Sequence, residues 1–514
     1  MNAPAGSMAS VGTTTAPIRI VVIGGGFTGL AFIIHAIRTR LGIGRNRGDS
    51  DEESGSESGP LLQFDLIERN GELGRGIAYG TPDRLHRINV PSDRMSLLAD
   101  DPRHATRWLI EHDTLDPGST DANGHHYVAR EHYGAYVAAT LSETLTLAGE
   151  RVRFTRWPAN ATAIRSHAAA KATTSGNTGG HGEEHTETNS FDVVLDSGHV
   201  LEGDRVVLCI GHAPPALPCA VSEEALGDPA LIVNPWAPRV FEGVPREASV
   251  LIVGTGLTMA DCAVSLLARD HRGPITAISR RGLLAQPHGL FSDGADFLRD
   301  GSPPDTARAL VRLLRKRIAH DTPQTGWQPT VDAFRFDLPR LWGALPPQEK
   351  RRVIRRLLAF WDVHRFRVAP QVHAALRDAI DTARISIERL GIAGIERSRD
   401  GLVATLRRPT GELDQRVFDR IVFCTGPSRN ITGNPLVRSL LDAGLARLDA
   451  TGVGLDVTLQ SQIKSEDGRP VPGLFALGPI TRGTFGEMTG APDIARHIEK
   501  WLKQATPHLL AQVA

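Results

Sequence analysis

Residues 18–29 read Ile-Arg-Ile-Val-Val-Ile-Gly-Gly-Gly-Phe-Thr-Gly, an apolar run that opens directly into a glycine-rich turn. The run predicts a buried strand over Ile18–Ile23, and the periodic stretch Leu30–Arg40 after the turn predicts a helix. In a GxGxxG turn, Gly24 would make the tight bend, Gly26 would let a pyrophosphate approach the backbone, and Gly29 would let the helix pack on the strand. The stretch therefore predicts a Rossmann-like unit that binds a dinucleotide at the start of its first helix.

An acidic residue completes this first unit. Gln63–Ile67 reads as the second strand, and Glu68 follows it, where a carboxylate can accept a hydrogen bond from a ribose hydroxyl. The separation from Gly29 exceeds the usual spacing of about 20 residues because the polar stretch Arg45–Pro60 intervenes. The turn is preceded by a predicted strand and followed by a predicted helix and an acidic residue in the expected order. A glycine turn that arises by chance is therefore a poor explanation of this segment.

A second turn, Gly254-Thr255-Gly256-Leu257-Thr258-Met259, follows the predicted strand Ser249–Val253. Met259 replaces the third glycine, which implies wider packing of the following helix, Ala260–Leu267. The next predicted strand, Ile275–Ser279, ends in Arg280-Arg281. An arginine there can pair with the 2′-phosphate of NADPH, so Arg280 is the expected coenzyme selector. The alternative is a surface arginine pair that solvates a strand end.

Composition and charge argue against several classes of function and of site. A chain of 514 residues predicts two or more packed units. Lys plus Arg and Asp plus Glu are both 58, so no net field attracts nucleic acid or an anionic membrane. The four cysteines are scattered without a CxxC pair, which argues against a metal site or a disulfide framework. Residues 1–17 lack the pattern of a secretory signal, and a reduced, cytoplasmic enzyme is expected.

The remaining sequence alternates short β-branched runs with amphipathic ones, the pattern of parallel sheets wound with helices. Two polar stretches, Arg45–Pro60 and Ala168–Asn189, read as solvated insertions. Further strands are predicted at Arg205–Cys209, Arg420–Cys424 and Leu474–Leu477, and an insertion of helices at Ala307–Ile318, Pro347–Val363 and Val372–Ala383.

Glycines also follow later strands. Gly211 and Gly426 come just after apolar runs and read as crossovers between two dinucleotide-binding units. Gly473–Pro479 forms a last strand and turn, and Ala491-Pro492-Asp493 predicts a helix with proline in its first turn. Such a helix start, aimed at a bound ring, would stabilise negative charge on it.

These segments in combination resemble a bacterial family of FAD/NAD(P)-binding monooxygenases that contains FAD-dependent urate hydroxylases of the Xanthomonas type and aspartate N-monooxygenases. The resemblance covers nearly the whole chain from Ile18 onward, apart from the two polar insertions. The stretches that carry it are Gly24–Gly29, Gly74–Tyr79, Asn89, Asn234–Trp236, Gly254–Asp261 and Gly478–Gly483.

The resemblance implies an α/β fold of two Rossmann-like dinucleotide-binding domains, with a discontinuous FAD domain, an inserted NAD(P) domain and a helical insertion. The expected limits are 17–230 and 426–514 for the FAD domain, with insertions near 45–60 and 168–189; 231–300 and 386–425 for the NAD(P) domain; and 301–385 for the helical insertion. The expected cofactor-binding residues are Gly24, Gly25, Gly26, Phe27, Thr28, Gly29, Glu68, Arg75, Gly76, Tyr79, Asn89, Gly254, Thr255, Gly256, Arg280, Gly478 and Pro479.

FAD is thus the expected cofactor, and NADH or NADPH the expected cosubstrate. Two departures from the wider flavin-containing monooxygenases concern oxygenase chemistry and not flavin binding. Asn234-Pro235-Trp236 lacks the histidine of their fingerprint, and Pro479 replaces a common acid after the last strand.

The basic and aromatic stretch Trp361–Arg367 lies in the helical insertion. An arginine fork suits a small anionic substrate such as urate, so Arg365, Arg367 and His364 are the candidate substrate-binding or catalytic residues. The alternative is a helix that buries its aromatic residues and solvates its outer face.

Three functions remain open. The first is a monooxygenase that uses oxygen to convert urate to 5-hydroxyisourate, with N-hydroxylation of an amino acid as the alternative within that class. The second is an NAD(P)H-dependent flavin oxidoreductase without oxygen insertion, although the lack of a CxxC pair argues against a dithiol reductase. The third is a module in which FAD is structural. The sequence leaves the oligomeric state open.

Overall fold

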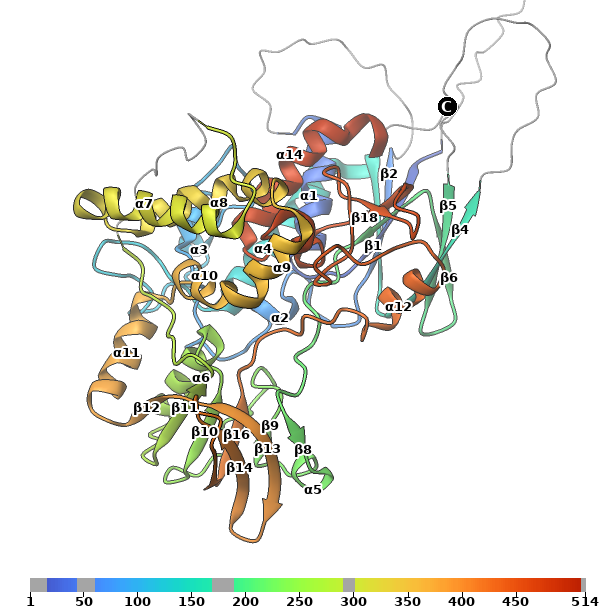
Figure 1. The fold of residues 1–514 in the computed structure, drawn as a ribbon. Coiled ribbons are helices and arrows are strands. Elements are labelled where there is room, and N and C mark those ends of the chain that lie inside the picture. Colours follow the sequence, from blue (N-terminus) through green and yellow to red (C-terminus); the bar gives the residue numbers. More distant parts are fainter. Residues whose placement is uncertain (1–15, 44–60, 169–188, 290–300, 510–514) are drawn as a thin grey trace, which may run out of the picture.

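The computed structural model describes residues 16–43, 61–168, 189–289 and 301–509. The predicted polar insertions lie outside these residues, except for Ala168 and Asn189, which belong to strands β4 and β5. Figure 1 shows two sheet-based parts and a group of helices beside them. The predicted α/β fold class is confirmed. The domain limits stay predictions.

The first sheet is built from segments near both ends of the described chain. Its order is β17-β18-β7-β1-β2-β3, and all neighbours are parallel except β17 and β18. Ile18 pairs with Leu62 and Ile23 with Ile67, so β1 and β2 end at the same edge. The strands are β1 (Ile18–Ile23), β2 (Leu62–Ile67), β3 (Val152–Trp157), β7 (Arg205–Leu208), β17 (Gln462–Lys464) and β18 (Pro470–Ala476).

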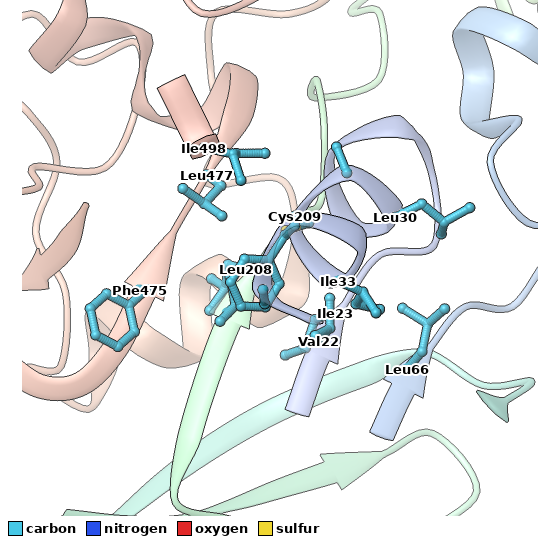
Figure 2. Close-up of a cluster of buried hydrophobic side chains, with 14 of the residues drawn as sticks. Val22, Ile23, Leu30, Ile33, Leu66, Leu208, Cys209, Phe475, Leu477 and Ile498 are labelled. Carbon is cyan, nitrogen blue, oxygen red and sulfur yellow. The ribbon is translucent and has the colours of Figure 1, made fainter. Parts of the chain in front are cut away.

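Helix α1 (Phe27–Leu41) packs on this sheet because its inward positions are apolar and fully buried. Figure 2 shows Leu30 and Ile33 of α1 near the strand residues Val22 and Ile23. Helices α4 (Arg130–Ala148) and α14 (Ala491–Leu509) contact α1, and α14 contributes Ile498 to the same core. The glycine turn at the start of α1 is thereby held on a rigid core.

The second sheet repeats the plan of the first. Its order is β12-β11-β10-β16-β9, with every neighbouring pair parallel. Helix α6 (Leu257–Ala268), which follows β10, packs against α11 (Pro370–Asp381) beside the sheet. The strands are β9 (Leu231–Ile232), β10 (Val250–Val253), β11 (Ile275–Ser279), β12 (Ile385–Arg389) and β16 (Arg420–Phe423).

The predicted helical insertion is present, with five helices among its described residues where three were predicted. They are α11, described above, and α7 (Ala307–Thr325), α8 (Gln328–Gly343), α9 (Pro347–Arg356) and α10 (Leu358–Arg365). The single predicted helix Pro347–Val363 is wrong, because the chain breaks at Leu357 into α9 and α10. Helix α8 was missed because Pro329 and Pro339 interrupt its pattern. Its Trp342 indole donates to the Gly483 carbonyl (2.8 Å), which ties these helices to the C-terminal segment.

Two antiparallel sheets and short helices complete the described fold. One sheet has the order β4-β5-β6 and the other β15-β14-β13-β8, in which only the β13–β8 pair is parallel. Their strands are β4 (Ala161–Ala168), β5 (Asn189–Leu195), β6 (Val200–Gly203), β8 (Ala220–Val221), β13 (Gly391–Ser398), β14 (Gly401–Arg407) and β15 (Leu413–Phe418). The other α-helices are α2 (Gly76–Tyr79), α3 (His104–Glu111), α5 (Glu223–Leu226), α12 (Pro435–Asp442) and α13 (Arg482–Phe485). The 3₁₀ turns are η1 (Ser92–Arg94), η2 (Gly149–Arg151) and η3 (Gly478–Thr481).

Candidate functional site

The first glycine turn has the geometry expected of a dinucleotide site. Gly24 has φ +109°, and a Cβ there would lie 2.4 Å from the Cys209 carbonyl oxygen on the neighbouring strand. A Cβ at Gly29 would lie 1.9 Å from the Gly24 carbonyl oxygen, so the first turn of α1 lies directly against the bend. At both positions a side chain would collide with the protein's own backbone, whether or not a ligand is bound.

Gly26 differs, because the nearest protein atom to a Cβ built there is Gly76 Cα at 3.5 Å. Gly76 begins α2, and the Gly74 amide donates to the Gly25 carbonyl (2.8 Å), so two backbone segments without side chains face each other at the start of α1. A half-buried helix N-terminus with this clearance fits a pyrophosphate. The residues present therefore fit the FAD that the sequence predicts.

Aromatic rings close one side of this turn. The Tyr79 ring lies 4.8 Å from the Tyr133 ring and 6.2 Å from the Phe27 ring. Tyr133 comes from α4 and its hydroxyl donates to the Met95 carbonyl (2.7 Å). The predicted residues Phe27 and Tyr79 are thus brought together, and Tyr133 is a wall residue that sequence reasoning missed.

Glu68 lies at the carboxyl end of β2, beside the turn. Its Oε2 accepts the Gly25 amide (2.8 Å) and its Oε1 accepts the Asn70 amide (2.9 Å). The carboxylate is therefore held at the position expected for a ribose contact. Arg75 pairs through Nε with Glu72 (2.8 Å) on the rim of the same turn.

The C-terminal segment meets the turn from another side. A Cβ at Gly478 (φ +76°) would lie 2.7 Å from Thr28 Oγ1, so the buried η3 turn with Pro479 packs on the first residues of α1.

Asn89 accepts through its carbonyl from His288 Nε2 (2.7 Å). Burial lowers the pKa of His288 to about 4, which keeps the ring neutral at neutral pH.

The second turn repeats the first, with one difference. A Cβ at Gly254 (φ +117°) would lie 2.1 Å from the Cys424 carbonyl oxygen, whereas a Cβ at Gly256 would meet no protein atom within 4 Å. Met259, in the place of the third glycine, is fully buried in the second core. The space above Gly256 suits a second dinucleotide.

Arg280 and Arg281 differ in their surroundings. Arg280 is exposed, and its side chain makes no ion pair or hydrogen bond within the part of the chain that the structure describes. Arg281 donates to the Arg356 carbonyl (3.0 Å) and lies over the Phe360 ring, 4.5 Å from its centroid. Arg280 is therefore the one of the two that is available for a ligand.

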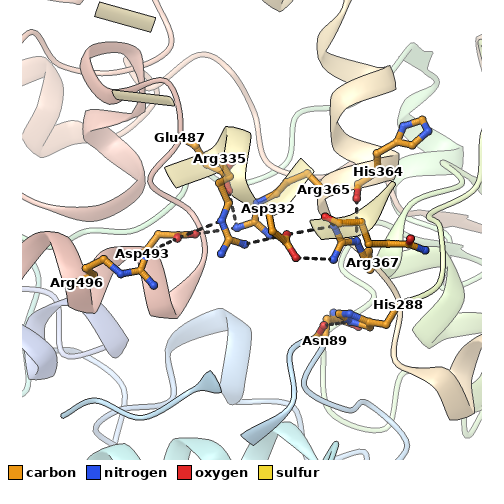
Figure 3. A network of polar contacts seen from close by, with 11 residues as sticks. Asn89, His288, Asp332, Arg335, His364, Arg365, Arg367, Glu487, Asp493 and Arg496 are labelled. Atoms are coloured by element: carbon orange, nitrogen blue, oxygen red, sulfur yellow. Dashed lines mark hydrogen bonds and ion pairs between the residues drawn. The ribbon is translucent and has the colours of Figure 1, made fainter. Parts of the chain in front are cut away.

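The basic stretch of the helical region lies inside a charge network (Figure 3). Arg365 pairs with Glu487 (2.6 Å) and Asp493 (2.8 Å), and Arg367 donates to both oxygens of Asp332 (3.0 and 3.1 Å). The two arginines are 7% and 4% exposed. Their guanidinium groups are thus neutralised by carboxylates, and an anionic substrate would have to displace one of these contacts.

His364 joins this network only through its backbone carbonyl, which accepts from Arg367 Nε (3.2 Å). Its ring is exposed and its Nδ1 is 2.7 Å from the Phe360 carbonyl of the same helix. The neighbouring Asp362 is half-buried, and its carboxylate makes no hydrogen bond or ion pair with another described residue. Burial, and next the charge of Glu487, raise the pKa of Asp362 to about 7 against the opposing effect of nearby arginines. Sequence reasoning missed Asp362 as a candidate acid or base.

Polar residues also join the two sheet-based parts. Arg130 on α4 pairs with Asp261 on α6 (2.7 Å), and its guanidinium lies over the Trp236 ring, 5.2 Å from the centroid. The His86 ring is 2.9 Å from the Ser265 hydroxyl, which donates to Asp83 (2.8 Å). These contacts hold α6 and the second turn in a defined position relative to the first part.

Two of the scattered cysteines are neighbours in space. Cys262 Sγ and Cys424 Sγ are 3.6 Å apart in the buried core of the second part. Burial raises the pKa of Cys262 well above its ordinary value, so the group stays a thiol at neutral pH. The pair has the surroundings of structural cysteines.

Comparison with known proteins supports this geometry. Residues 21–213 match a family described as FAD-NAD(P)-binding. A comparison with curated protein sequences finds no match. The chain therefore carries an FAD/NAD(P)-binding region, in agreement with the cofactors predicted from the sequence.

Solved structures share the fold over almost the whole chain. Ornithine hydroxylase from Pseudomonas aeruginosa is 14% identical, with a TM-score of 0.59 over 96% of this chain and 100% of that one. L-lysine 6-monooxygenase from Pseudomonas syringae is 16% identical, with a TM-score of 0.58 over 95% and 100%. Bacillithiol disulfide reductase from Staphylococcus aureus is 11% identical, with a TM-score of 0.52 over 96% and 99%. The chain thus shares its fold with these hydroxylases and with a disulfide reductase.

These comparisons do not support the urate part of the expectation. In the described part of the chain, no helix is both long and apolar enough to cross a membrane.

Proposed function

We propose that this protein is an FAD-dependent, NAD(P)H-consuming monooxygenase that hydroxylates the amino nitrogen of a small amino-acid-like substrate. The observation that carries the proposal is the end-to-end likeness in fold to ornithine and lysine hydroxylases, which includes 95–96% of this chain. The reaction consumes the amine, O₂, NAD(P)H and a proton, and yields the hydroxylamine, water and NAD(P)⁺. FAD supplies the acceptance of hydride and the activation of oxygen.

Charges in the helical region favour an amine over an anion. Arg365 and Arg367 already face carboxylates, whereas the Asp362 carboxylate has no partner among the described residues. An ionised Asp362 would attract a substrate ammonium group. With a pKa of about 7, it could also accept the proton that the nitrogen must lose before it reacts.

Urate hydroxylation, the first expectation from the sequence, requires an anion site. Arg365 or Arg367 would have to exchange a carboxylate for urate, and breaking a buried ion pair is costly. We therefore place amine hydroxylation first and retain urate as a substrate in the test. The roles of Arg365, Arg367 and His364 stay predictions.

The test uses the purified holoenzyme with NADPH or NADH and oxygen. L-ornithine, L-lysine, L-aspartate and urate are added separately, and oxygen use, hydrogen peroxide and product mass are followed. An amino acid should lower the peroxide yield and gain one oxygen atom. Coupling by urate alone would select the urate hydroxylase instead. Peroxide release unchanged by every compound would favour an oxidoreductase without oxygen insertion.

A further inference from the structure

We propose that Arg280, Arg389 and Arg407 together form a binding site for the 2′-phosphate of NADPH, which selects NADPH over NADH. The inference deepens the proposed function and rests on one part of it, the binding of a nicotinamide dinucleotide at the second glycine turn. Arg389 ends β12 and Arg407 ends β14, both far along the chain from Arg280.

The turn that carries Arg280 is fixed to the second glycine turn. Thr255, between Gly254 and Gly256, donates through Oγ1 to the Leu283 carbonyl (2.6 Å), and its Oγ1 lies 2.9 Å from Ser279 Oγ, whose hydroxyl can donate to it. These bonds hold both ends of the segment 279–283. A dinucleotide whose pyrophosphate lies on the Gly254–Gly256 turn extends its adenosine ribose toward the carboxyl end of the next strand, which here is β11. Arg280 therefore lies where a 2′-phosphate is recognised.

Strand register brings Arg389 to the same edge. Ser279 of β11 pairs with Arg389 of the parallel strand β12, and the Leu390 amide donates to the Ser279 carbonyl (3.0 Å). A Cβ built on Gly282 would lie 3.4 Å from Arg389 Cβ. The stem of Arg389 thus borders the turn that contains Arg280.

Arg407 reaches this edge through the hairpin of β13 and β14. Gly391 pairs with Arg407, and a Cβ at Gly391 would lie 3.8 Å from Arg407 Cβ and 4.0 Å from Arg280 Cγ. Gly391 therefore stands between the stems of Arg280 and Arg407 and takes up little of the space between them. Three arginine stems from three different strand ends converge here.

Neighbouring acids do not neutralise these arginines. Glu388 pairs with Arg416 (2.9 Å), and Asp414 pairs with Arg416 (3.1 Å) and Arg408 (3.4 Å). Arg280, Arg389 and Arg407 are exposed, and within the described ranges their side chains make no ion pair or hydrogen bond. Three arginines whose stems lie at one edge and whose charges have no counter-charge among the described residues can attract a dianion, and guanidinium groups suit the fork geometry of phosphate oxygens.

The test compares 2′,5′-ADP with 5′-AMP, which differ only in the 2′-phosphate. Binding of each to the full-length holoenzyme is measured by titration calorimetry at fixed ionic strength. The wild type should bind 2′,5′-ADP at least about tenfold more tightly, and Arg389→Ala and Arg407→Ala should each lower that preference about tenfold, as expected for a charged hydrogen bond. Arg399→Ala is the matched control, because this exposed arginine lies at the opposite end of the same hairpin.

Each outcome bears on a different statement. Equal weakening of both ligands by Arg389→Ala and Arg407→Ala, or no loss in either variant, would overturn the three-arginine site. If the wild type binds 5′-AMP but gains nothing from the 2′-phosphate, this inference fails and the nicotinamide site stands. If the wild type binds neither ligand, the nicotinamide site of the proposed function fails with it. Unchanged melting temperatures confirm that the variants are folded.

Discussion

The Arg130 guanidinium donates to the Asp261 carboxylate at 2.7 Å, and this ion pair joins the two sheet-based parts of the molecule. Arg130 begins α4, which packs beside the first glycine turn, whereas Asp261 lies on α6, which the second turn opens. Both side chains are nearly inaccessible to solvent. The pair therefore sets how the second turn faces the first, which is the geometry that hydride transfer between two dinucleotides depends on.

Asp261→Asn should slow anaerobic reduction of FAD by NADPH while FAD stays bound. The substitution keeps the shape but leaves Arg130 without its counter-charge, and breaking a buried pair costs about 3–5 kcal/mol. Stopped-flow absorbance measures the reduction rate, and the flavin content of the purified variant is the control. A variant that melts earlier yet is reduced at the wild-type rate would make the pair purely structural.

The same pair predicts a pH dependence. Burial raises the pKa of Asp261 to about 6, above its ordinary value of 3.8, so the folded state favours the protonated acid. Its contribution to the free energy of unfolding is therefore greatest below about pH 4 and declines as the pH rises to about 6. The charged pair itself exists above pH 6. The reduction rate of the wild type should fall below that pH, and the rate of Asp261→Asn should not show this step.

Gly24 and Gly26 should respond differently to a side chain. Gly24→Ala places a Cβ 2.4 Å from the Cys209 carbonyl oxygen at φ +109°, so we expect little folded protein. The Cβ of Gly26→Val would lie 3.5 Å from the nearest backbone atom, so the variant should fold but lack FAD, because its side chain enters the space of the pyrophosphate. Circular dichroism and flavin absorbance separate the two results. Full flavin content in Gly26→Val would end the assignment of FAD to this turn.

Gly256→Val should leave FAD bound and impair only the binding of the nicotinamide dinucleotide. A Cβ at Gly256 meets no protein atom within 4 Å, so the folded structure accepts the side chain, which then occupies the second dinucleotide space. Flavin content should match the wild type, while NADPH reduces the flavin more slowly. Loss of FAD together with the slower reduction would mean that the two turns do not serve separate ligands.

Local patterns explain why much of the fold could be predicted. Buried parallel strands are continuous apolar runs, and the predicted limits of β1 and β11 match the structure at every residue. The antiparallel hairpin of β13 and β14 was missed, because its strands are half-buried and lack a continuous apolar run. Helix α8 was missed because its stability comes from buried residues such as Leu341 and Trp342 and outweighs its prolines.

Some residues of the candidate site could likewise be predicted from local sequence, and others could not. Gly24 and Gly26 lie in one glycine turn, and Glu68 ends the next predicted strand. Their joint role in binding a dinucleotide could therefore be predicted from the order of these local patterns. Arg389 and Arg407 reach the Arg280 edge only through strand register, which no local pattern contains. Arg365 illustrates the converse: the sequence shows its charge, but its partners Glu487 and Asp493 lie more than a hundred residues away.

Arg365→Met should destabilise the protein whether or not substrate is present. Its removal leaves Glu487 and Asp493 buried without their main counter-charge, an expected loss of about 3–5 kcal/mol. Burial already raises the pKa of Glu487, and loss of Arg365 removes the strongest opposing effect. Protonation of the acids then relieves the strain, so the loss should shrink as the pH falls. Thermal unfolding across pH measures this dependence.

The double variant Arg365→Met/Glu487→Gln distinguishes this structural role from a substrate contact. Glu487→Gln removes a buried carboxylate that has lost its counter-charge. It should recover part of the lost stability, because Arg365 and Glu487 are directly coupled. Arg496→Met is the matched control, since Arg496 is half-exposed and 3.5 Å from the same Asp493, and its loss should cost less than about 1 kcal/mol. If Arg365→Met keeps its melting temperature at every pH but loses substrate coupling, the arginine instead acts on the substrate.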